Sequence, residues 1–357
     1  MKIVRRKTKV VKVGPVFIGR DHPIAIQSMT KCRTADTERA IRQINELDEA
    51  GCEIVRLAIK DMDDARALKR IKAKVKLPLV ADIHFSYRLA LAAIESGADK
   101  IRLNPGNIHN KQEIEKVIAA LKKAKIPLRV GLNSGSVKDT GHRRSSMTDR
   151  LVASCMDYIK MIEKLKFNDI VISLKANNVL DTVEAYRKIA KLCDYPLHLG
   201  VTATGSPYNG IIKSSVALGA LLLGGIGDTI RVSLTDSPLE EVRAAKCILE
   251  GVGLRRTGTQ IMSCPTCGRC EVDLFSIVKE LEEKLARSSA GWPSAKPLKV
   301  AVMGCVVNGP GEAKEADIGV AFGKKEGLMF RKGKPGRKIS FKQCAKVLLE
   351  EIKHAND

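Results

Sequence analysis

Aromatic side chains are scarce in this chain of 357 residues, which has seven Phe, five Tyr and one Trp. Proteins that bind nucleic acid usually combine a basic surface with aromatic rings on which bases stack. The chain is strongly basic, with a formal net charge of +22 and basic runs at residues 2–9, 122–125 and 324–338. Because the rings are so few, we interpret most of this charge as a solvated surface of Lys and Glu. We therefore expect no nucleic-acid partner.

Long apolar runs are also missing. The longest, at residues 216–226, is interrupted by glycines and is too short to cross a bilayer. The first ten residues, MKIVRRKTKV, carry charge but no apolar signal core. These absences predict a cytoplasmic enzyme that does not bind membranes, and a hydrophobic content of 44% excludes wholesale disorder.

Short β-branched runs alternate with amphipathic helical stretches over most of the chain. After a predicted hairpin with its turn at Gly14-Pro15, eight candidate strands are each followed by a helical pattern: 24–28, 54–58, 79–82, 100–103, 128–132, 170–174, 197–201 and 229–234. Eight such units in about 230 residues match a (β/α)8 TIM barrel. The alternative is a doubly wound sheet. It normally has a glycine-rich phosphate loop after its first strand, and the segment QSMT at residues 27–30 contains no glycine.

The pattern changes after Leu254. We predict a substrate-binding barrel at residues 1–253 and a second domain at residues 254–357. Residues 255–259 are a predicted linker, which leads to a cysteine cluster, a helix at 273–286, a strand at 298–303, a glycine-rich loop, two short strands and a helix at 340–353. This order predicts a small α+β domain.

Five of the predicted strands end in a cation: Arg56, Arg102, Arg129, Lys175 and Arg231. Functional groups of TIM barrels lie at these carboxyl ends. Any one cation could instead point outward and pair with a barrel helix, but an unpaired buried charge costs several kcal/mol, and Asp82 cannot neutralise all five. Five cations at one end of the barrel predict a ligand with about two phosphates or one diphosphate. Neutral donors at the same ends are Asn104, Asn133 and Ser233.

Ten cysteines in a chain with no apparent secretion signal indicate metal or redox chemistry rather than a disulfide framework. Four of them stand in two motifs, CPTCGRC at residues 264–270 and GCVVNGPGE at residues 304–312. Three ligand sets remain open: zinc on four cysteines, an iron–sulfur cubane on the same four, or a cubane on Cys264, Cys267, Cys305 and Glu312. In the last set, the exchangeable oxygen ligand leaves one iron able to bind a substrate oxygen.

Taken together, the motifs resemble the family of 4-hydroxy-3-methylbut-2-enyl diphosphate synthases of the non-mevalonate isoprenoid pathway. The resemblance runs nearly end to end and is carried by PIAIQSMT (23–30), IVR (54–56), ADIHF (81–85), IRLNPGN (101–107), RVGLNS (129–134), IGDTIRVS (226–233), CPTCG (264–268) and GCVVNGPGE (304–312). It implies a barrel similar to dihydropteroate synthase, followed by a C-terminal domain with a [4Fe-4S] cluster.

The resemblance implies a two-electron reductive ring opening of 2-C-methyl-D-erythritol 2,4-cyclodiphosphate, with loss of water. The implied substrate-binding residues are Arg56, Arg102, Asn104, Arg129, Asn133, Lys175, Arg231 and Ser233. The implied catalytic residues are Asp82, His84 and Glu312, of which Glu312 would be displaced from one iron by the substrate hydroxyl. A flavodoxin or ferredoxin would supply the electrons, and the implied assembly is a homodimer.

The implied cluster ligands are Cys264, Cys267, Cys305 and Glu312. Cys270 is then a neighbour and not a ligand, because family members often lack a cysteine at this position. One departure concerns the seventh strand end, where the family usually has Val-Thr-Glu-Ala-Gly and this chain has VTATG at residues 201–205. Ala203 therefore stands where the family has a carboxylate, and the resemblance implies that this carboxylate donates a proton in the dehydration.

Two other functions remain as alternatives to the diphosphate synthase. The first is a phosphate-ester TIM-barrel enzyme with a structural zinc module, which would be colourless and hold stoichiometric zinc. The second is a basic RNA-binding metalloprotein, which would bind nucleic acid with a steep salt dependence. The scarcity of aromatic rings counts against the RNA-binding protein.

Overall fold

The computed structural model describes residues 3–108, 110–136, 146–202, 204–256, 258–288 and 298–356. The chain divides into two compact units, Met1–Arg255 and Arg256–Asp357. This division falls two residues after the boundary expected between residues 253 and 254. In the described part of the chain, no helix combines the length and the apolar character needed to span a membrane.

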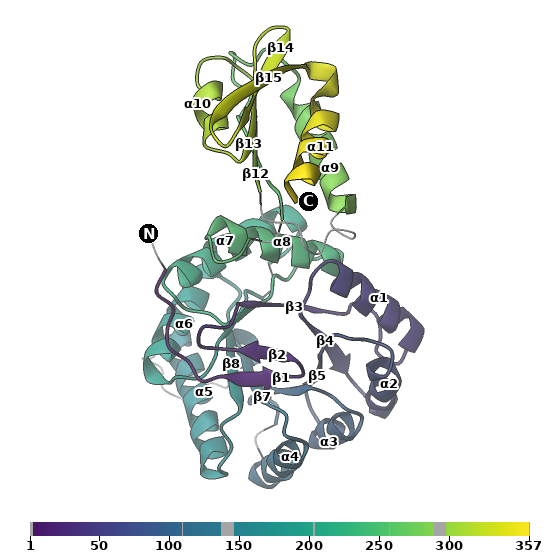
Figure 1. The fold of residues 1–357 in the computed structure, drawn as a ribbon. Coiled ribbons are helices and arrows are strands. Elements are labelled where there is room, and N and C mark those ends of the chain that lie inside the picture. Colours follow the sequence, from purple (N-terminus) through teal and green to yellow (C-terminus); the bar gives the residue numbers. More distant parts are fainter. Residues whose placement is uncertain are drawn as a thin grey trace. The chain divides into compact units, whose positions relative to one another are not determined.

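Eight parallel strands form a ring in the first unit (Figure 1). The sheet order runs from β3 to β8 in sequence, and β10 lies between β3 and β9. A bridge between Ile172 in β8 and Leu197 beside β9 closes the ring. The strands are β3 (Ala25–Met29), β4 (Ile54–Ile59), β5 (Leu79–Ile83), β6 (Lys100–Leu103), β7 (Leu128–Asn133), β8 (Ile170–Lys175), β9 (His198–Leu199) and β10 (Thr229–Ile230). The predicted TIM barrel is confirmed, although the last two strands are shorter than expected.

Eight helices alternate with these strands and surround the ring (Figure 1). Helix α4 illustrates why they form where the sequence predicts. Its first turn is capped by Asn110, whose side chain accepts hydrogen bonds from two backbone N–H groups, and Ile114, Val117, Ile118 and Leu121 are its buried face. The helices are α1 (Thr37–Glu49), α2 (Met62–Lys72), α3 (Tyr87–Glu95), α4 (Lys111–Ala124), α5 (Met147–Lys164), α6 (Val179–Leu192), α7 (Pro207–Leu223) and α8 (Pro238–Gly251), with a 3-10 turn at Ser134–Ser136.

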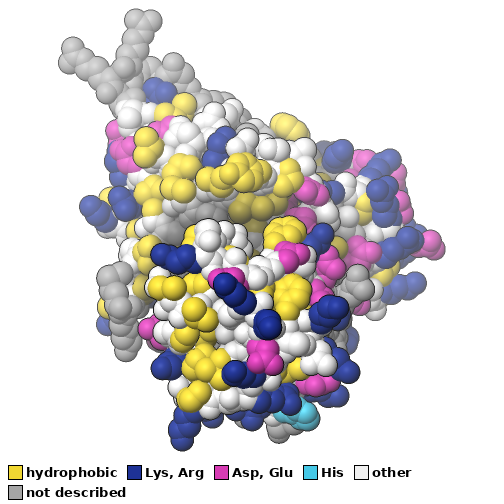
Figure 2. All heavy atoms as spheres, turned by 90° about the horizontal axis from the view of Figure 1, so that it is seen from above, with side chains coloured by type: hydrophobic (Ala, Val, Ile, Leu, Met, Phe, Trp, Pro, Cys, Tyr) yellow, Lys and Arg dark blue, Asp and Glu magenta, His cyan; other side chains and the backbone are white. Residues whose placement is uncertain are grey.

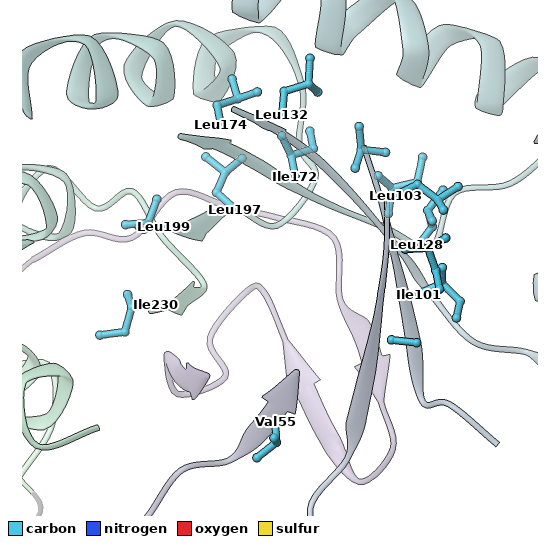
Figure 3. Packing of buried hydrophobic residues seen from close by; sticks show 14 of the residues in the cluster. Val55, Ile101, Leu103, Leu128, Leu132, Ile172, Leu174, Leu197, Leu199 and Ile230 are labelled. Atoms are coloured by element: carbon cyan, nitrogen blue, oxygen red, sulfur yellow. The ribbon is translucent and has the colours of Figure 1, made fainter. Parts of the chain in front are cut away.

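The two faces of the barrel strands have different roles. Outward residues such as Val55, Ile101 and Leu174 belong to the apolar layer between strands and helices (Figure 3). Inside the ring, one end is filled by a small apolar cluster in which the hairpin β1 (Val11–Val13) and β2 (Val16–Ile18) packs against strand residues. The predicted hairpin therefore closes the bottom of the barrel, which leaves the carboxyl ends of the strands for polar side chains.

The second unit is built on a five-stranded sheet in the order β11-β12-β13-β14-β15. Its first three strands are parallel and its last pairs are antiparallel. Its elements are β11 (Gln260–Ser263), α9 (Leu274–Ser288), β12 (Lys299–Met303), α10 (Gly309–Lys314), β13 (Ile318–Phe322), β14 (Glu326–Arg331), β15 (Lys334–Ser340), a 3-10 turn at Phe341–Gln343 and α11 (Cys344–Asn356). The α+β class is as predicted.

Three details of this unit correct the prediction. Strand β11 was not predicted; the cysteine cluster was expected to follow directly after the linker. Two of the four side chains of β11 are exposed, so no alternating apolar pattern indicates a strand. The glycine-rich loop contains the short helix α10, for which Pro310 provides a favourable first turn. Three strands, and not two, lie between the glycine-rich loop and the final helix.

Lys and Arg side chains are spread over the face seen in Figure 2, where Asp, Glu and hydrophobic side chains lie among them. This face shows no continuous basic stripe. The distribution agrees with the interpretation of the excess charge as mostly solvated surface.

Candidate active site

A polar cavity lies at the carboxyl ends of the barrel strands. The residues that line it are Arg56, Asp82, His84, Arg102, Arg129, Asn133, Ser173, Lys175, Thr202, Arg231 and Ser233. All five predicted cations are therefore brought together, along with Asp82, His84, Asn133 and Ser233. Ser173 was not predicted at the site, whereas Thr202 stands at the predicted end of the seventh strand but was assigned no role.

Strand register explains how these side chains meet. Asp82, Arg102 and Arg129 are aligned across the neighbouring strands β5, β6 and β7, and Asn133 is aligned with Lys175 across β7 and β8. Side chains alternate between the two faces of a strand, so aligned residues share one face. The row of charge across the barrel is thus fixed by backbone pairing.

Asp82 is the central partner of the cations. Its Oδ1 accepts a hydrogen bond of 3.0 Å from Arg102 Nη1, and its Oδ2 lies 3.5 Å from Arg56 Nε and 3.5 Å from His84 Nε2. Burial opposes ionisation, but the guanidinium groups of Arg56 and Arg102 outweigh it and hold the pKa of the Asp82 carboxyl well below its usual value.

A second carboxylate, Glu241 of α8, reaches the edge of the site and was not predicted. Its side chain is buried, and Oε2 lies 3.5 Å from Arg231 Nη2, while Oε1 lies 3.1 Å from Lys31 Nζ. It also accepts hydrogen bonds from the Ser28 hydroxyl and the Leu234 N–H. Since it lies in a helix more than 150 residues after Asp82, no local motif connects the two.

Several hydrogen-bond donors inside the barrel have no acceptor among the residues that the structure describes. In the described part of the chain, Nε of Arg102, Arg129 and Arg231 is buried without a hydrogen-bond partner. Burial, followed by repulsion from Arg231 and Arg56, lowers the pKa of Lys175 well below its ordinary value. A site with several unmet donors and repelling cations favours an anionic ligand that supplies acceptor oxygens.

Two more basic residues, Lys100 and His198, lie inside the barrel but do not line the cavity. Both are completely buried, and Lys100 Nζ and His198 Nε2 have no partner among the described residues. Burial and the nearby Arg129 lower the pKa of both side chains well below their ordinary values. Lys100 stands at the beginning of its strand, whereas the predicted site residues stand at the carboxyl ends of the strands.

Asn104 and Ala203 differ from the other predicted positions. Asn104 is buried but does not line the cavity; its Oδ1 accepts a hydrogen bond from the Gly106 N–H, which stabilises the turn after β6. Ala203, where the resemblance leads us to expect a carboxylate, lies outside the described residues.

The cysteine motifs of the second unit lie at one edge of its sheet. Cys264 directly follows β11 and Cys305 follows β12 by two residues, and these strands are parallel neighbours. The Gly304 N–H donates to Cys264 Sγ at 3.4 Å, and a Cβ atom at Gly304 would collide with Cys270 Sγ. Within the described residues, no three His, Cys, Asp or Glu side chains are close enough together to enclose a metal ion.

The chemistry of these donors fits an iron–sulfur cluster. Cys305 is nearly buried, and the backbone N–H groups of Asn308, Val307 and Gly309 lower its pKa, which favours the thiolate form that binds iron. Cys267 and Glu312 are exposed, so both are accessible to a bound group. The absence of a side chain at Gly304 lets the sulfur of Cys270 lie beside that of Cys264.

These features define a class: a TIM-barrel protein with a cationic pocket, joined to an α+β domain with clustered cysteines. Comparison with known proteins identifies the group within this class. Residues 8–246 match the GcpE TIM-barrel domain and residues 260–354 match the GcpE protein C-terminal domain. The chain belongs to the GcpE family, which confirms the relationship predicted from the motifs.

Curated relatives match along almost their whole length. The chain is 51% identical over 350 residues to a protein of Clostridium perfringens, covering 98% of this chain and 99% of that protein. It is 48% identical over 360 residues to one of Fusobacterium nucleatum, covering 99% of this chain and all of the relative. Both relatives are named 4-hydroxy-3-methylbut-2-en-1-yl diphosphate synthase (flavodoxin).

Solved structures agree with the barrel fold. A dihydropteroate synthase from Stenotrophomonas maltophilia has a TM-score of 0.52 and 13% identity, covering 70% of this chain and all of that one. The corresponding enzyme from Xanthomonas albilineans has a TM-score of 0.50 and 14% identity, covering 68% and 98%. At this identity the likeness concerns the fold alone, and the predicted likeness to dihydropteroate synthase is confirmed in that sense.

Proposed function

We propose that this protein converts 2-C-methyl-D-erythritol 2,4-cyclodiphosphate into 4-hydroxy-3-methylbut-2-enyl diphosphate in isoprenoid biosynthesis. The reaction takes up two electrons, opens the ring at a C–O bond and releases water. The observation that carries the proposal is the convergence of five cations on one cavity where the nearby carboxylates are too few to neutralise them. The names of the curated relatives agree with this enzyme class.

The barrel cations bind the diphosphate in this proposal. Arg56, Arg102, Arg129, Lys175 and Arg231 supply donors, and forked guanidinium groups suit phosphate oxygens. When the ring opens, the phosphate oxygen that leaves carbon gains negative charge. Cations already fixed around it stabilise that charge without having to reorganise. Asn133 and Ser233 add neutral donors at the same mouth, and Asn104 shapes the adjoining loop.

Asp82 and His84 lie where a proton can be held. His84 Nε2 stands 3.1 Å from Arg102 Nη1 and 3.5 Å from Asp82 Oδ2, and the ring is half exposed at the cavity. We assign proton delivery to the departing hydroxyl to His84, with Asp82 orienting both His84 and Arg102. The dehydration needs a proton donor other than residue 203, because Ala203 replaces the carboxylate expected there, and His84 would fill this role.

The second unit holds the redox centre in this proposal. Cys264, Cys267, Cys305 and Glu312 would bind a [4Fe-4S] cluster, with Cys270 beside it. When bound, the cluster supplies single electrons, and its oxygen-ligated iron is a Lewis acid for a substrate oxygen. Flavodoxin is the proposed donor, with ferredoxin as the alternative. Ten free cysteines suit the reducing cytoplasm, in which we place the reaction.

We further propose that the working assembly is a homodimer. Helices α7 and α8 border a groove lined by Ile211, Gly219, Ala244, Ile248 and others. Beside it, Tyr208, Ile212 and Val216 of α7 are exposed, which is unusual for large apolar side chains gathered on one helix. Size-exclusion chromatography with light scattering tests the assembly: a dimer is expected, and Val216→Glu is expected to yield monomers.

The activity is tested with anaerobically reconstituted protein. Iron and sulfide content, the absorption spectrum and product formation from the cyclic diphosphate are measured with reduced flavodoxin. Product is expected in proportion to cluster content. Colourless protein with stoichiometric zinc would instead favour the phosphate-ester enzyme with a zinc module, and product from cluster-free protein would refute the redox proposal.

Matched cysteine variants sharpen this test. Cys305→Ser is expected to lose the cluster, because it removes the thiolate stabilised by three backbone N–H groups. Cys344→Ser is the control, since Cys344 is buried at the beginning of α11 in the apolar core of the same unit. If both variants keep full iron content, the proposed ligand set is wrong.

A further inference from the structure

Cys270 has no assigned role, yet the structure places its sulfur in the proposed cluster cradle. A Cβ atom at Gly304 would collide with Cys270 Sγ and would stand 3.6 Å from Cys264 Sγ. Both sulfurs therefore lie within 4 Å of one point, on the side of Gly304 where any other residue would have a side chain. The inference below rests on the cluster site of the proposed function.

Backbone hydrogen bonds hold the two cysteines at Gly304. The Gly304 N–H donates to Cys264 Sγ at 3.4 Å, and the Gly304 carbonyl oxygen accepts from the Glu271 N–H at 2.8 Å. The Cys270 N–H donates to the Cys267 carbonyl oxygen at 2.8 Å. The segment that follows Cys267 is thereby folded back onto the end of β12, and this turn directs Cys270 toward Cys264.

The other two cysteines of the two motifs, Cys267 and Cys305, differ from this pair in exposure. Cys267 is exposed, whereas Cys264 and Cys270 are both half-buried and pack against the apolar core of the unit. Cys305 is nearly buried and is held by backbone N–H groups at the beginning of α10. The geometry therefore brings the sulfurs of Cys264 and Cys270 together on one side of Gly304.

We propose that Cys264 and Cys270 form a reversible disulfide when the protein holds no cluster. A low-molecular-weight disulfide such as oxidised glutathione is the oxidant. One cysteine thiolate attacks it and releases one glutathione thiolate; the other cysteine then attacks the mixed disulfide and releases the second. The protein loses two electrons and two protons, and the oxidant is reduced to two thiols.

This disulfide would protect a cluster ligand. A free Cys264 thiolate can be oxidised irreversibly to sulfinic or sulfonic acid, whereas a disulfide is restored by thiols. Cluster assembly would then require prior reduction. Cys270 would thus protect Cys264 from irreversible oxidation while no cluster is bound, and would not itself bind iron. This role agrees with its predicted position beside the cluster.

The sequence permits a direct test by peptide mapping. Trypsin cuts after Arg256, Arg269 and Lys279, so Cys264 and Cys270 fall in different peptides. Cluster-free full-length protein is treated with oxidised glutathione, alkylated, digested without reduction and analysed by mass spectrometry. A link between peptides 257–269 and 270–279 is expected, together with the loss of two free thiols, and both should be reversed by dithiothreitol.

Variants identify the partner within the first peptide. The link should persist in Cys267→Ser and in the control Cys247→Ser, which changes an exposed cysteine of α8 in the barrel unit. It should vanish in Cys264→Ser and in Cys270→Ser, and in the latter Cys264 should instead carry glutathione. A link that survives in Cys264→Ser, or one to the Cys305 peptide, would overturn the proposal.

Iron loading gives a second readout that does not depend on activity. Oxidised wild-type protein is expected to take up iron and sulfide only after reduction, while Cys270→Ser treated alike and freed of glutathione should load as well as untreated protein. If the link is absent but the cluster assembles normally, only this inference fails. If no cluster assembles under any condition, the proposed function fails instead.

Discussion

Gly131 lies directly beside the guanidinium group of Arg102, and a Cβ atom at position 131 would stand 2.7 Å from Arg102 Nε. The Gly131 carbonyl oxygen accepts a hydrogen bond of 2.9 Å from Arg102 Nη2. One glycine thus gives Arg102 both space and an acceptor. Gly200 likewise makes room for Lys175, whose Nζ would be 2.6 Å from a Cβ atom there. The cationic pocket therefore depends on two residues that have no side chain.

Gly131→Ala is expected to weaken substrate binding. The added methyl group would overlap Arg102 Nε, and a shift of the guanidinium group to relieve that overlap would weaken its contact with Asp82. We expect KM for the cyclic diphosphate to rise by about tenfold, or about 1.4 kcal/mol, with a smaller change in kcat. Steady-state kinetics of the reconstituted enzyme measure this effect.

Gly336→Ala provides the matched control. Gly336 lies in the exposed strand β15 of the second unit, where a Cβ atom would meet only the Met329 carbonyl oxygen at 3.7 Å. Its kinetics and iron content should equal those of the wild type. An unchanged KM in Gly131→Ala, with normal folding, would show that Arg102 does not bind the substrate.

Asp82→Asn is expected to destabilise the protein in a pH-dependent way. The folded-state pKa of Asp82 is lowered by its guanidinium neighbours, so its stabilising effect is complete above the unfolded pKa, near 4. That effect is lost as the pH falls through the folded pKa. At pH 7 we expect the variant to lose about 3 kcal/mol, because Arg56 and Arg102 lose their partner.

Urea unfolding between pH 7 and pH 3 measures this prediction. The difference between the wild type and Asp82→Asn should be largest near neutrality. It should shrink below about pH 4, because the unfolded wild-type chain then binds a proton at Asp82 that the folded protein does not yet bind. A difference that stays constant across the whole range would mean that Asp82 is not an ion-pair partner of the two arginines.

The barrel and its cations could be predicted because both depend on local patterns. Each strand is a short β-branched run, each helix has a 3.6-residue apolar period, and the carboxyl ends of parallel strands meet at one rim. A charged residue near such an end, such as Arg102 or Lys175, is therefore expected to lie at this rim. Nine of the ten barrel residues predicted for the site line the cavity for this reason.

What the sequence did not reveal depends on contacts between distant segments. Glu241 looks like an ordinary acidic residue in the first turn of α8, and only the fold brings it to Arg231 and Lys31. Asn104 stands in the predicted motif, but its side chain caps its own turn. Lys100 is the first residue of a predicted strand, where a lysine is ordinarily exposed, yet it is completely buried inside the barrel.

Glu241→Gln tests the contribution of this unpredicted carboxylate. The amide keeps the size of the side chain but removes its charge, so buried contacts with Arg231 and Lys31 weaken. We expect a loss of about 2 kcal/mol in the free energy of unfolding, and a rise in KM larger than the fall in kcat, because Glu241 positions Arg231 without touching the substrate. Glu241→Asp should restore part of both.

Glu184→Gln is the control for the loss of a glutamate charge. Glu184 of α6 is exposed and pairs with Lys188 one helical turn away, so its removal should change stability by no more than about 0.5 kcal/mol. If Glu241→Gln behaves like this control in both stability and KM, Glu241 has no positioning role.

Lys100→Met is expected to make the protein more stable. The Lys100 amine is fully buried, has no hydrogen-bond partner among the described residues and lies near Arg129. Its folded pKa is lowered, so at pH 7 the unfolded chain binds a proton that the folded protein binds poorly, and stability is lost as the pH falls below the unfolded pKa, near 10.4. Methionine has a similar size and no charge. We expect a gain of about 2 kcal/mol at pH 7 that shrinks as the pH rises toward 10.

Chemical unfolding at pH 7, 8.5 and 10 measures this gain, with Lys123→Met on the exposed side of α4 as a control that should change little. A loss of stability in Lys100→Met would mean that the amine has a partner inside the barrel, which would refute the prediction. If the variant is more stable but binds inorganic diphosphate more weakly, the buried amine contributes to the positive charge that attracts an anion into the cavity. The cost of the lysine in the free protein would then be the consequence of a pocket built to hold two phosphates.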